Sequence, residues 1–231
     1  MTVHLKPVSL AEKSSANFPT YKHLSERIMD TNEYTKLALV TESKPETLNF
    51  NRGGLLRLLT MLTLASDIAD QAKKTMFYGK PLDVDSFREK LGRLADQSQT
   101  LASSADHISR PEDTAISLNA PNLRVLHAGI GMFGESGEVI EAIVKQIQTG
   151  ELDMVNCSEE MGDLLWYGAI FSDETGVPIE QSMEANINKL RLRYGDKFSS
   201  NAALNRDLAG ERTILEAGLA ANDVAAGDKA A

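Results

Sequence analysis

The sequence has very few of the residues that build disulfide frameworks and zinc sites. Its 231 residues include one cysteine, Cys157, and four histidines that are scattered without metal-ligand spacing. One cysteine cannot form a disulfide within the chain, and zinc sites need several thiolate or imidazole ligands at short spacing. A disulfide framework and a thiolate zinc site within one chain are therefore excluded.

Long apolar runs and a surplus of positive charge are also missing. No apolar run reaches the ~20 residues that a membrane helix needs, and residues 1–15 lack the apolar core of a signal peptide. The formal charge is −9 at pH 7, which disfavours binding along the phosphate backbone of a nucleic acid. With 42% hydrophobic and 25% charged residues, the composition is typical of a globular protein. We expect a cytoplasmic protein without membrane or nucleic-acid partners.

The sequence has no alternating β-branched runs joined by hairpin turns, so little β-structure is expected. Apolar residues instead recur at three- and four-residue spacing, which predicts amphipathic helices, and several of these segments end in glycine as helices often do. The predicted helices cover residues 52–79, 86–106, 138–150, 157–176 and 179–195. The fold class is therefore predicted to be all-α.

A glycine-rich stretch, "GIGMFG" at residues 129–134, satisfies the G-x-G-x-x-G pattern of dinucleotide-binding folds. That pattern is informative only between a strand and a helix of a βαβ unit, and no second parallel strand follows. Glu135 would also place negative charge next to a pyrophosphate. The glycines are more consistent with close approach of another helix or of a ligand to the backbone.

Two pairs of acidic residues are arranged symmetrically about a turn. Glu135 and Glu138 precede the turn around Gly150, and Glu160 and Asp163 follow it at a similar distance. Side chains three residues apart lie on one side of a helix. If the chain forms an antiparallel hairpin, rising ~1.5 Å per residue on both arms, the four carboxylates meet at one level.

Clustered carboxylates repel one another unless a cation lies between them. Hard oxygen ligands favour Mg²⁺ or Mn²⁺ over zinc, so the pattern predicts a divalent-cation site. The alternative is a solvated acidic face whose charges pair with Lys145 or with arginines. The spacing of the acids alone does not decide between these interpretations.

A cationic helix follows the acidic pairs. Asn186, Lys189 and Arg193 lie at steps of three and four residues on one face of the predicted helix 179–195. Together with a metal site, such a face would suit a polyphosphate ligand, because Lys and Arg can neutralise the oxygens that the metal does not. An exposed helix with basic residues near its C-terminus, favoured by the helix dipole, explains the same pattern.

Together these segments resemble the MazG-like family of all-α nucleoside triphosphate pyrophosphohydrolases. The family pattern, E-x-x-E, a spacer and E-x-x-D, is matched by Glu135, Glu138, Glu160 and Asp163, with 21 residues between the two pairs. "HAGIGMFGESGE", "EEMGDLLWY" and "NINKLRLRYGDKF" look like family segments in the family order. The resemblance covers roughly residues 121–200.

The resemblance implies that the four acids are catalytic and bind Mg²⁺, with Mn²⁺ as the other candidate ion. It also implies that water attacks a nucleoside triphosphate to give a nucleoside monophosphate and pyrophosphate. One glutamate would accept the proton of the water, and the sequence does not indicate which. The candidate phosphate ligands are Lys145, Asn186, Lys189 and Arg193. His127 either lines the nucleoside side of the site or packs between helices, and for Trp166 and Tyr167 core packing is favoured over base stacking.

An internal repeat is also predicted. Residues 65–96 align with residues 136–167 if one residue is inserted in the turn, which matches Lys74 with Lys145 and Gly79 with Gly150. The first copy places Leu64, Asp67, Lys90 and Arg93 at the four acid positions, so it could not hold Mg²⁺. Alternatively, two amphipathic hairpins align this well by chance.

We therefore expect a helical-hairpin bundle with four parts: a polar arm (1–33), a degenerate MazG-like half (34–110), a catalytic half (111–200), and a short helix with a flexible tail (201–231). The predicted activity is Mg²⁺-dependent hydrolysis of a nucleoside triphosphate or a related nucleotide. The alternatives are a regulatory protein that binds a nucleotide without turnover and a structural helical protein. Because one chain is predicted to contain both copies of the hairpin, a monomer or a homodimer is expected.

Overall fold

The computed structural model describes residues 29–44, 50–107 and 122–227, with side chains as far as residue 219. These residues form helices and no strand, which confirms the all-α prediction. None of the described helices is long and apolar enough to cross a membrane. The elements are α2 (Thr31–Ala38), the 3₁₀ helix η1 (Leu39–Thr41), α3 (Arg52–Tyr78), α4 (Val84–Ser103), the 3₁₀ helix η2 (Ala105–His107), α5 (Leu123–Thr149), α6 (Met154–Thr175), α7 (Ile179–Tyr194), α8 (Ser200–Leu204) and α9 (Leu208–Gly227).

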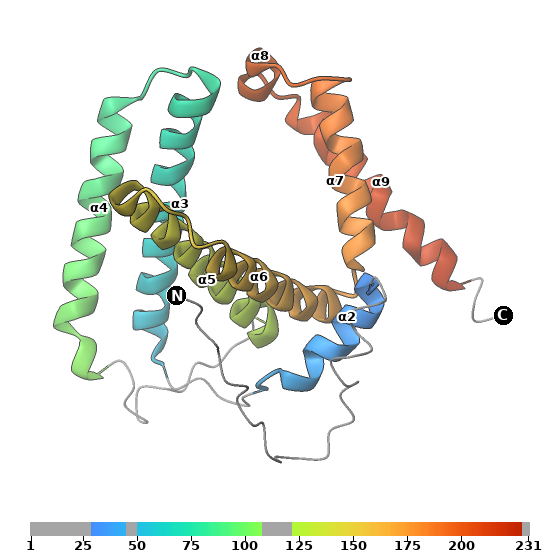
Figure 1. The fold of residues 1–231 in the computed structure, drawn as a ribbon, viewed down its shortest axis with the longest axis horizontal. Helices are drawn as coiled ribbons and strands as arrows, with labels where there is room; N and C mark the ends of the chain where they lie inside the picture. Colours follow the sequence, from blue (N-terminus) through green and yellow to red (C-terminus); the bar gives the residue numbers. More distant parts are fainter. Residues whose placement is uncertain (1–28, 45–49, 108–121, 228–231) are drawn as a thin grey trace, which may run out of the picture.

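Two antiparallel hairpins, α3–α4 and α5–α6, contain more than half of the described residues (Figure 1). Helix α2 packs on α6, and α7 packs against α9 beyond the C-terminal end of α6. The predicted helix 138–150 is only the second half of α5, because the helix begins at Leu123 and includes the glycine-rich stretch. The residues before the glycine-rich stretch are thus helical, so the G-x-G-x-x-G pattern does not follow a strand.

The two hairpins share their start and stop signals. In each, an asparagine side chain caps a helix of 27 residues, a glycine with positive φ ends that helix, and an aspartate caps the next one. An Asn or Asp cap accepts from free N–H groups of the first turn, and glycine adopts the left-handed conformation at little cost. The residues are Asn51, Gly79 and Asp83 in α3–α4, and Asn122, Gly150 and Asp153 in α5–α6.

The two hairpins differ in charge at positions that the predicted repeat matches with the acidic residues. Lys90 on α4 donates to Asp67 on α3, with 2.8 Å between Nζ and Oδ2. The alignment matches these two positions with Glu160 and Glu138, which are both acidic. The ammonium group thus stands where the other hairpin has a second carboxylate. The shared caps agree with a degenerate repeat, and common descent of the two hairpins stays a prediction.

An ion cluster centred on Arg124 fixes the segment after α2 to the α5–α6 hairpin. The guanidinium binds Glu42, whose side chain is fully buried, together with Asp173 and Glu174 at the end of α6. Arg124 lowers the pKa of Glu42. Trp166 on α6 makes a second contact with this part of the chain, because its indole Nε1–H donates to the carbonyl of Ala38 in α2 at 3.0 Å. These contacts place α2 beside the acidic residues of α6.

The ends of the chain are more helical than the sequence predicts, as far as they are described. Helix α2 begins at Thr31, inside the predicted polar arm, where Asp30 caps it. Helix α9 continues to Gly227, well into the predicted flexible tail. The alanine-rich composition of that segment explains the difference, because alanine has the highest helix propensity. Residues 1–28 and 228–231 lie outside the described residues, as do residues 108–121, which include the predicted boundary between the two halves.

Candidate active site

The two helices of the α5–α6 hairpin approach each other closely at Gly131. A Cβ atom on Gly131 would lie 2.1 Å from a ring carbon of Tyr167, whereas Gly129 and Gly134 have nothing within 4 Å of an added Cβ. The predicted close approach of another helix is thus confirmed at Gly131. The helices can come together here because this residue has no side chain.

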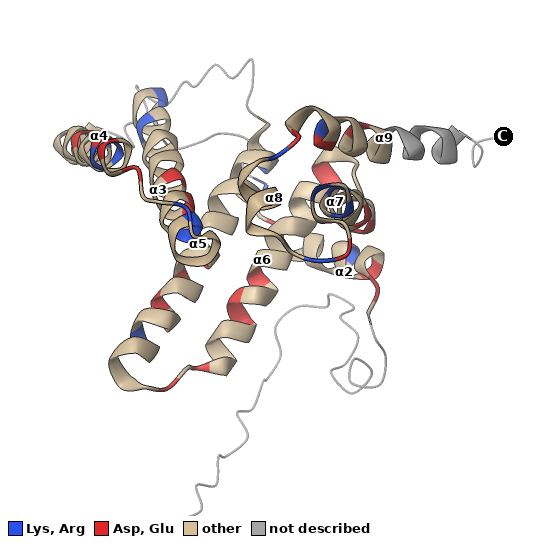
Figure 2. Ribbon diagram, turned by 90° about the horizontal axis from the view of Figure 1, so that it is seen from above, with Lys and Arg blue, Asp and Glu red and all other residues tan. Residues whose placement is uncertain are grey.

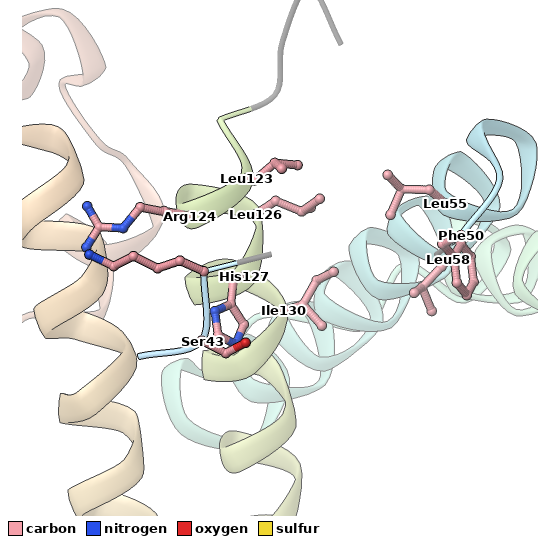
Figure 3. Close-up of a pocket in the computed structure, with 10 residues that line it drawn as sticks. Ser43, Phe50, Leu55, Leu58, Leu123, Arg124, Leu126, His127 and Ile130 are labelled. Atoms are coloured by element: carbon pink, nitrogen blue, oxygen red, sulfur yellow. The ribbon is translucent and has the colours of Figure 1, made fainter. Parts of the chain in front are cut away.

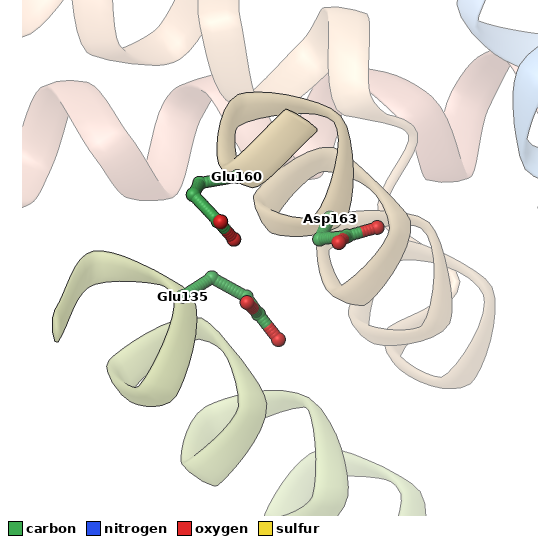
Figure 4. A group of neighbouring side chains, drawn as sticks. All are labelled: Glu135, Glu160 and Asp163. Atoms are coloured by element: carbon green, nitrogen blue, oxygen red, sulfur yellow. The ribbon is translucent and has the colours of Figure 1, made fainter. Parts of the chain in front are cut away.

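One helical turn further along, acidic residues from both helices converge. Glu135 on α5 and Glu160 and Asp163 on α6 each offer a carboxylate oxygen, and these atoms all lie within 4.8 Å of one another. Figure 4 shows Glu135 and Glu160 pointing toward each other from the two helices. Glu160 is only 5% exposed, Glu135 is half-buried and Asp163 is exposed. The cluster therefore has a buried side and a side open to solvent.

Glu138 lies at the edge of this cluster and is coupled to it electrostatically. The negative charge of Glu160 is the main cause that raises the pKa of Glu138. Burial raises the pKa of Glu160, and its contact with Glu135 raises it further. Like charges held together favour protonation of one of them. All four predicted acids thus belong to one electrostatic group.

Among the described residues, none of these four acids forms an ion pair with a lysine or an arginine. Lys145, which could have neutralised them, pairs with Glu141 on its own helix at 3.1 Å. Within the part of the chain that the structure describes, the acidic group therefore lacks the counter-ions that a paired, solvated face would have. A set of carboxylate oxygens without His or Cys fits a hard divalent cation.

Residues 129–198 match the family model of the MazG nucleotide pyrophosphohydrolase domain. The chain carries a MazG-like domain. The match includes the four acids and the four candidate phosphate ligands, and indicates nucleotide pyrophosphohydrolase activity in general. No curated protein and no solved structure gives a significant match.

Three further side chains lie next to the acids of the MazG-like domain. Asn156, one turn before Glu160, donates to its carboxylate. The Tyr34 hydroxyl donates to the carbonyl of Gly162 at 3.1 Å, and the pKa values of both Tyr34 and Tyr167 are raised, first by burial and then by nearby acids. The spacing of Asn156 from Glu160 was visible in the sequence. The position of Tyr34 was not, because it depends on how α2 packs.

His127 lies on α5, about two helical turns before Glu135, and contacts two aromatic rings. Its ring centroid is 6.0 Å from that of Trp166 and 5.4 Å from that of Tyr167, both in edge-to-face geometry. His127 also lines a largely apolar cavity of about 440 Å³ between α3 and the start of α5 (Figure 3). The helix-packing and nucleoside-side interpretations of this histidine each have an observation in their favour.

The candidate phosphate ligands on α7 occupy different environments. Asn186 is exposed and lines a cavity of about 430 Å³ with Met132 and Phe171, next to the hairpin. Lys189 is half-buried. Arg193 is bound to Glu211 on α9 through two hydrogen bonds of 2.7 and 2.6 Å. Phosphate binding by Arg193 would therefore require this contact to change, and all three roles stay predictions.

The Arg193–Glu211 contact makes a testable contribution to stability. Arg193 and Arg206 lower the pKa of Glu211 to about 2. A carboxyl whose pKa falls on folding stabilises the protein above its unfolded pKa, and this stabilisation is lost as the pH falls through the folded value. We expect Glu211→Gln to lower the free energy of unfolding by about 2 kcal/mol at pH 7.

Urea unfolding of both proteins at several pH values measures this contribution. The difference between wild type and Glu211→Gln should shrink steadily as the pH is lowered from about 4.5 toward 2. Glu216→Gln is the matched control, because Glu216 makes an exposed pair with Arg212 on the same helix and such pairs contribute little. A difference that does not change with pH would contradict an ionic role for Glu211.

Proposed function

We propose that the α5–α6 hairpin is the active site of a Mg²⁺-dependent nucleoside triphosphate pyrophosphohydrolase that releases a nucleoside monophosphate and pyrophosphate. The observation that carries this proposal is the convergence of carboxylates from both helices, which pair with no lysine or arginine among the described residues. The match to the MazG family model supports the same reaction class.

Glu135, Glu138, Glu160 and Asp163 would hold the cation, Mg²⁺ or Mn²⁺. The chemistry that a bound divalent cation supplies is neutralisation of phosphate oxygens and a lower pKa for a coordinated water. Asp163 and Glu138 are exposed, so a polyphosphate can reach their carboxylates from solvent. Asn156 holds the buried carboxylate of Glu160 in a fixed orientation through its amide hydrogen bond.

The reaction needs a base and a cationic surface for the leaving group. One of the glutamates accepts a proton from the attacking water while the new phosphorus–oxygen bond forms and the bond to pyrophosphate breaks. Lys145, Asn186, Lys189 and Arg193 are proposed to contact the phosphates, because developing negative charge is stabilised by positioned cations and donors. His127 and the cavity it lines are proposed to receive the nucleoside.

The α3–α4 hairpin is proposed to be a catalytically silent copy. Only Asp67 remains of its four acids, and that carboxylate is paired with Lys90. The Lys90 ammonium group, within hydrogen-bonding distance of this carboxylate, neutralises its single negative charge. This hairpin therefore needs no cation, and we expect it to bind none.

The alternative function is a regulatory protein that binds a nucleotide without hydrolysing it. A screen for pyrophosphate release separates the two, using a panel of nucleoside triphosphates and related nucleotides with and without Mg²⁺. The proposal requires Mg²⁺-dependent release by the wild type and a loss of that activity in Glu138→Gln. Nucleotide binding without any release of pyrophosphate would favour the regulatory alternative.

A further inference from the structure

A cavity lies between the two hairpins, on the side of α5 that faces α3. Figure 2 shows α3 next to α5, and residues of both helices line this space of about 580 Å³. Its volume is that of a pocket for a small organic molecule. We call it the inter-hairpin cavity. Its lining includes Leu62, Ser66 and Asp67 of α3, and Leu126, Gly129 and Phe133 of α5.

The inter-hairpin cavity is separate from the acidic cluster. At ~100° per residue, Leu126 and Phe133 lie roughly opposite Glu135 around the axis of α5. Glu135 points toward α6, whereas the cavity faces α3. The body of α5 therefore stands between a ligand in this cavity and the Glu135 carboxylate. The space also differs from the cavity that His127 lines, although Leu126 contributes to both.

The lining of the inter-hairpin cavity is largely apolar and suits a flat ring. Leu62, Leu126 and Phe133 line it, and Phe133 is 39% exposed. An added Cβ at Gly129 would meet nothing within 4 Å, so the backbone of α5 is open to the cavity at this residue. An aromatic ring can therefore stack on Phe133 and pass close to α5.

Two polar side chains of the lining have unused hydrogen-bonding capacity. Lys90 donates to Oδ2 of Asp67 at 2.8 Å, and no other described residue donates to this carboxylate. The neighbouring Ser66 hydroxyl makes no hydrogen bond to another described residue. An ionised carboxylate has about four acceptor positions. Because Lys90 already neutralises the charge of Asp67, the remaining positions favour an uncharged donor such as a hydroxyl over a second cation.

We propose that the inter-hairpin cavity is a second, metal-independent site that binds a nucleoside. The base stacks on Phe133, and the sugar hydroxyls donate to Asp67 and contact Ser66. Aspartate and glutamate carboxylates accept from ribose hydroxyls in dinucleotide-binding folds. A purely apolar ligand would cover these polar groups without replacing the water that they bind. The proposal concerns binding and stands whether or not the protein hydrolyses a nucleotide.

Isothermal titration calorimetry of the full chain in EDTA tests this site with adenosine, guanosine, cytidine and uridine. Removing divalent cations keeps the acidic cluster from contributing to binding. At least one nucleoside should bind, and Asp67→Ala, which removes the acceptor, and Gly129→Leu, which fills the cavity, should each raise its dissociation constant at least tenfold. The free base should bind at least tenfold more weakly than the nucleoside. The monophosphate should bind no more tightly, because Lys90 is already paired.

Asp85→Ala is the matched control and should bind the nucleoside as the wild type does. Asp85 also pairs with a cation of α4, Arg88, but does not line the cavity. Far-UV circular dichroism confirms that each variant is folded. The proposal would be overturned if none of the four nucleosides bound, or if binding were unchanged in Asp67→Ala or in Gly129→Leu. A monophosphate that bound tenfold more tightly than its nucleoside would overturn the choice of an uncharged ligand.

Discussion

Glu160→Gln is expected to lower the rate of pyrophosphate release from a nucleoside triphosphate by about a thousandfold or more, the scale of losing one well-placed electrostatic group. Glu160 is the most buried of the four acids and contacts Glu135 and Asn156. Glutamine keeps the shape of the side chain and removes the charge that a cation needs. Initial rates at saturating Mg²⁺ and substrate measure the loss.

The melting temperature distinguishes this result from simple unfolding. Without divalent cations, Glu160→Gln should be at least as stable as the wild type, because the substitution removes repulsion within the acidic cluster. Asp67→Ala in the α3–α4 hairpin is the matched control and should keep nearly full activity. Equal losses of activity in the two variants would contradict the silent-copy proposal, and full activity of Glu160→Gln would contradict the proposed site.

Gly131→Ala is expected to lower both stability and activity, although it adds only one methyl group. The new Cβ would lie 2.1 Å from the Tyr167 ring, so α5 and α6 must separate or the ring must move. Overpacking of this kind costs about 1–3 kcal/mol. Glu135 and Asp163 lie one turn from Gly131 and Tyr167, so the carboxylates of the two helices should also separate, and activity should fall at least tenfold.

Gly134→Ala provides the control within the same glycine-rich stretch. An added Cβ at Gly134 meets nothing within 4 Å, and alanine is favoured over glycine in a helix by about 0.5–1 kcal/mol. This variant should therefore be slightly more stable than the wild type and fully active. Thermal unfolding and initial rates of both variants give the comparison. If Gly131→Ala and Gly134→Ala had the same stability and the same activity, the close approach of α5 to α6 at Gly131 would not be needed for the site.

The acidic cluster could be predicted from the sequence because it depends on local geometry. Two i, i+3 pairs at similar distances from Gly150 must face each other once the chain forms a hairpin there. Asp153, which caps α6, and Gly150, which ends α5, specify that hairpin. The fold class followed from the helical spacing of apolar residues in the same way.

Features that depend on tertiary packing could not be predicted. The sequence showed three glycines in "GIGMFG" but not that Gly131 alone would meet Tyr167. It showed that Arg193 is cationic but not that Glu211 would bind it. Helix α5 begins at Leu123 although glycines are poor helix formers, because packing against α6 and the cap at Asn122 outweigh that propensity.

The apolar side of α5 is another feature whose environment could not be predicted from the sequence. Ile140, Ile143 and Ile147 recur at helical spacing on one side of α5, and an apolar stripe of this kind usually faces a core. In the described residues this face is exposed. A periodic pattern shows which side of a helix avoids water, but not whether the same chain or a second copy covers it.

The most direct test of the shared cation site is a titration of metal-free protein with Mn²⁺, followed by electron paramagnetic resonance, for variants in each helix of the hairpin. Wild type should bind Mn²⁺, and both Glu135→Gln on α5 and Asp163→Asn on α6 should weaken binding at least tenfold. Asp67→Ala should bind as the wild type does. Unchanged binding in either hairpin variant, or no binding by the wild type, would contradict a cation held jointly by α5 and α6.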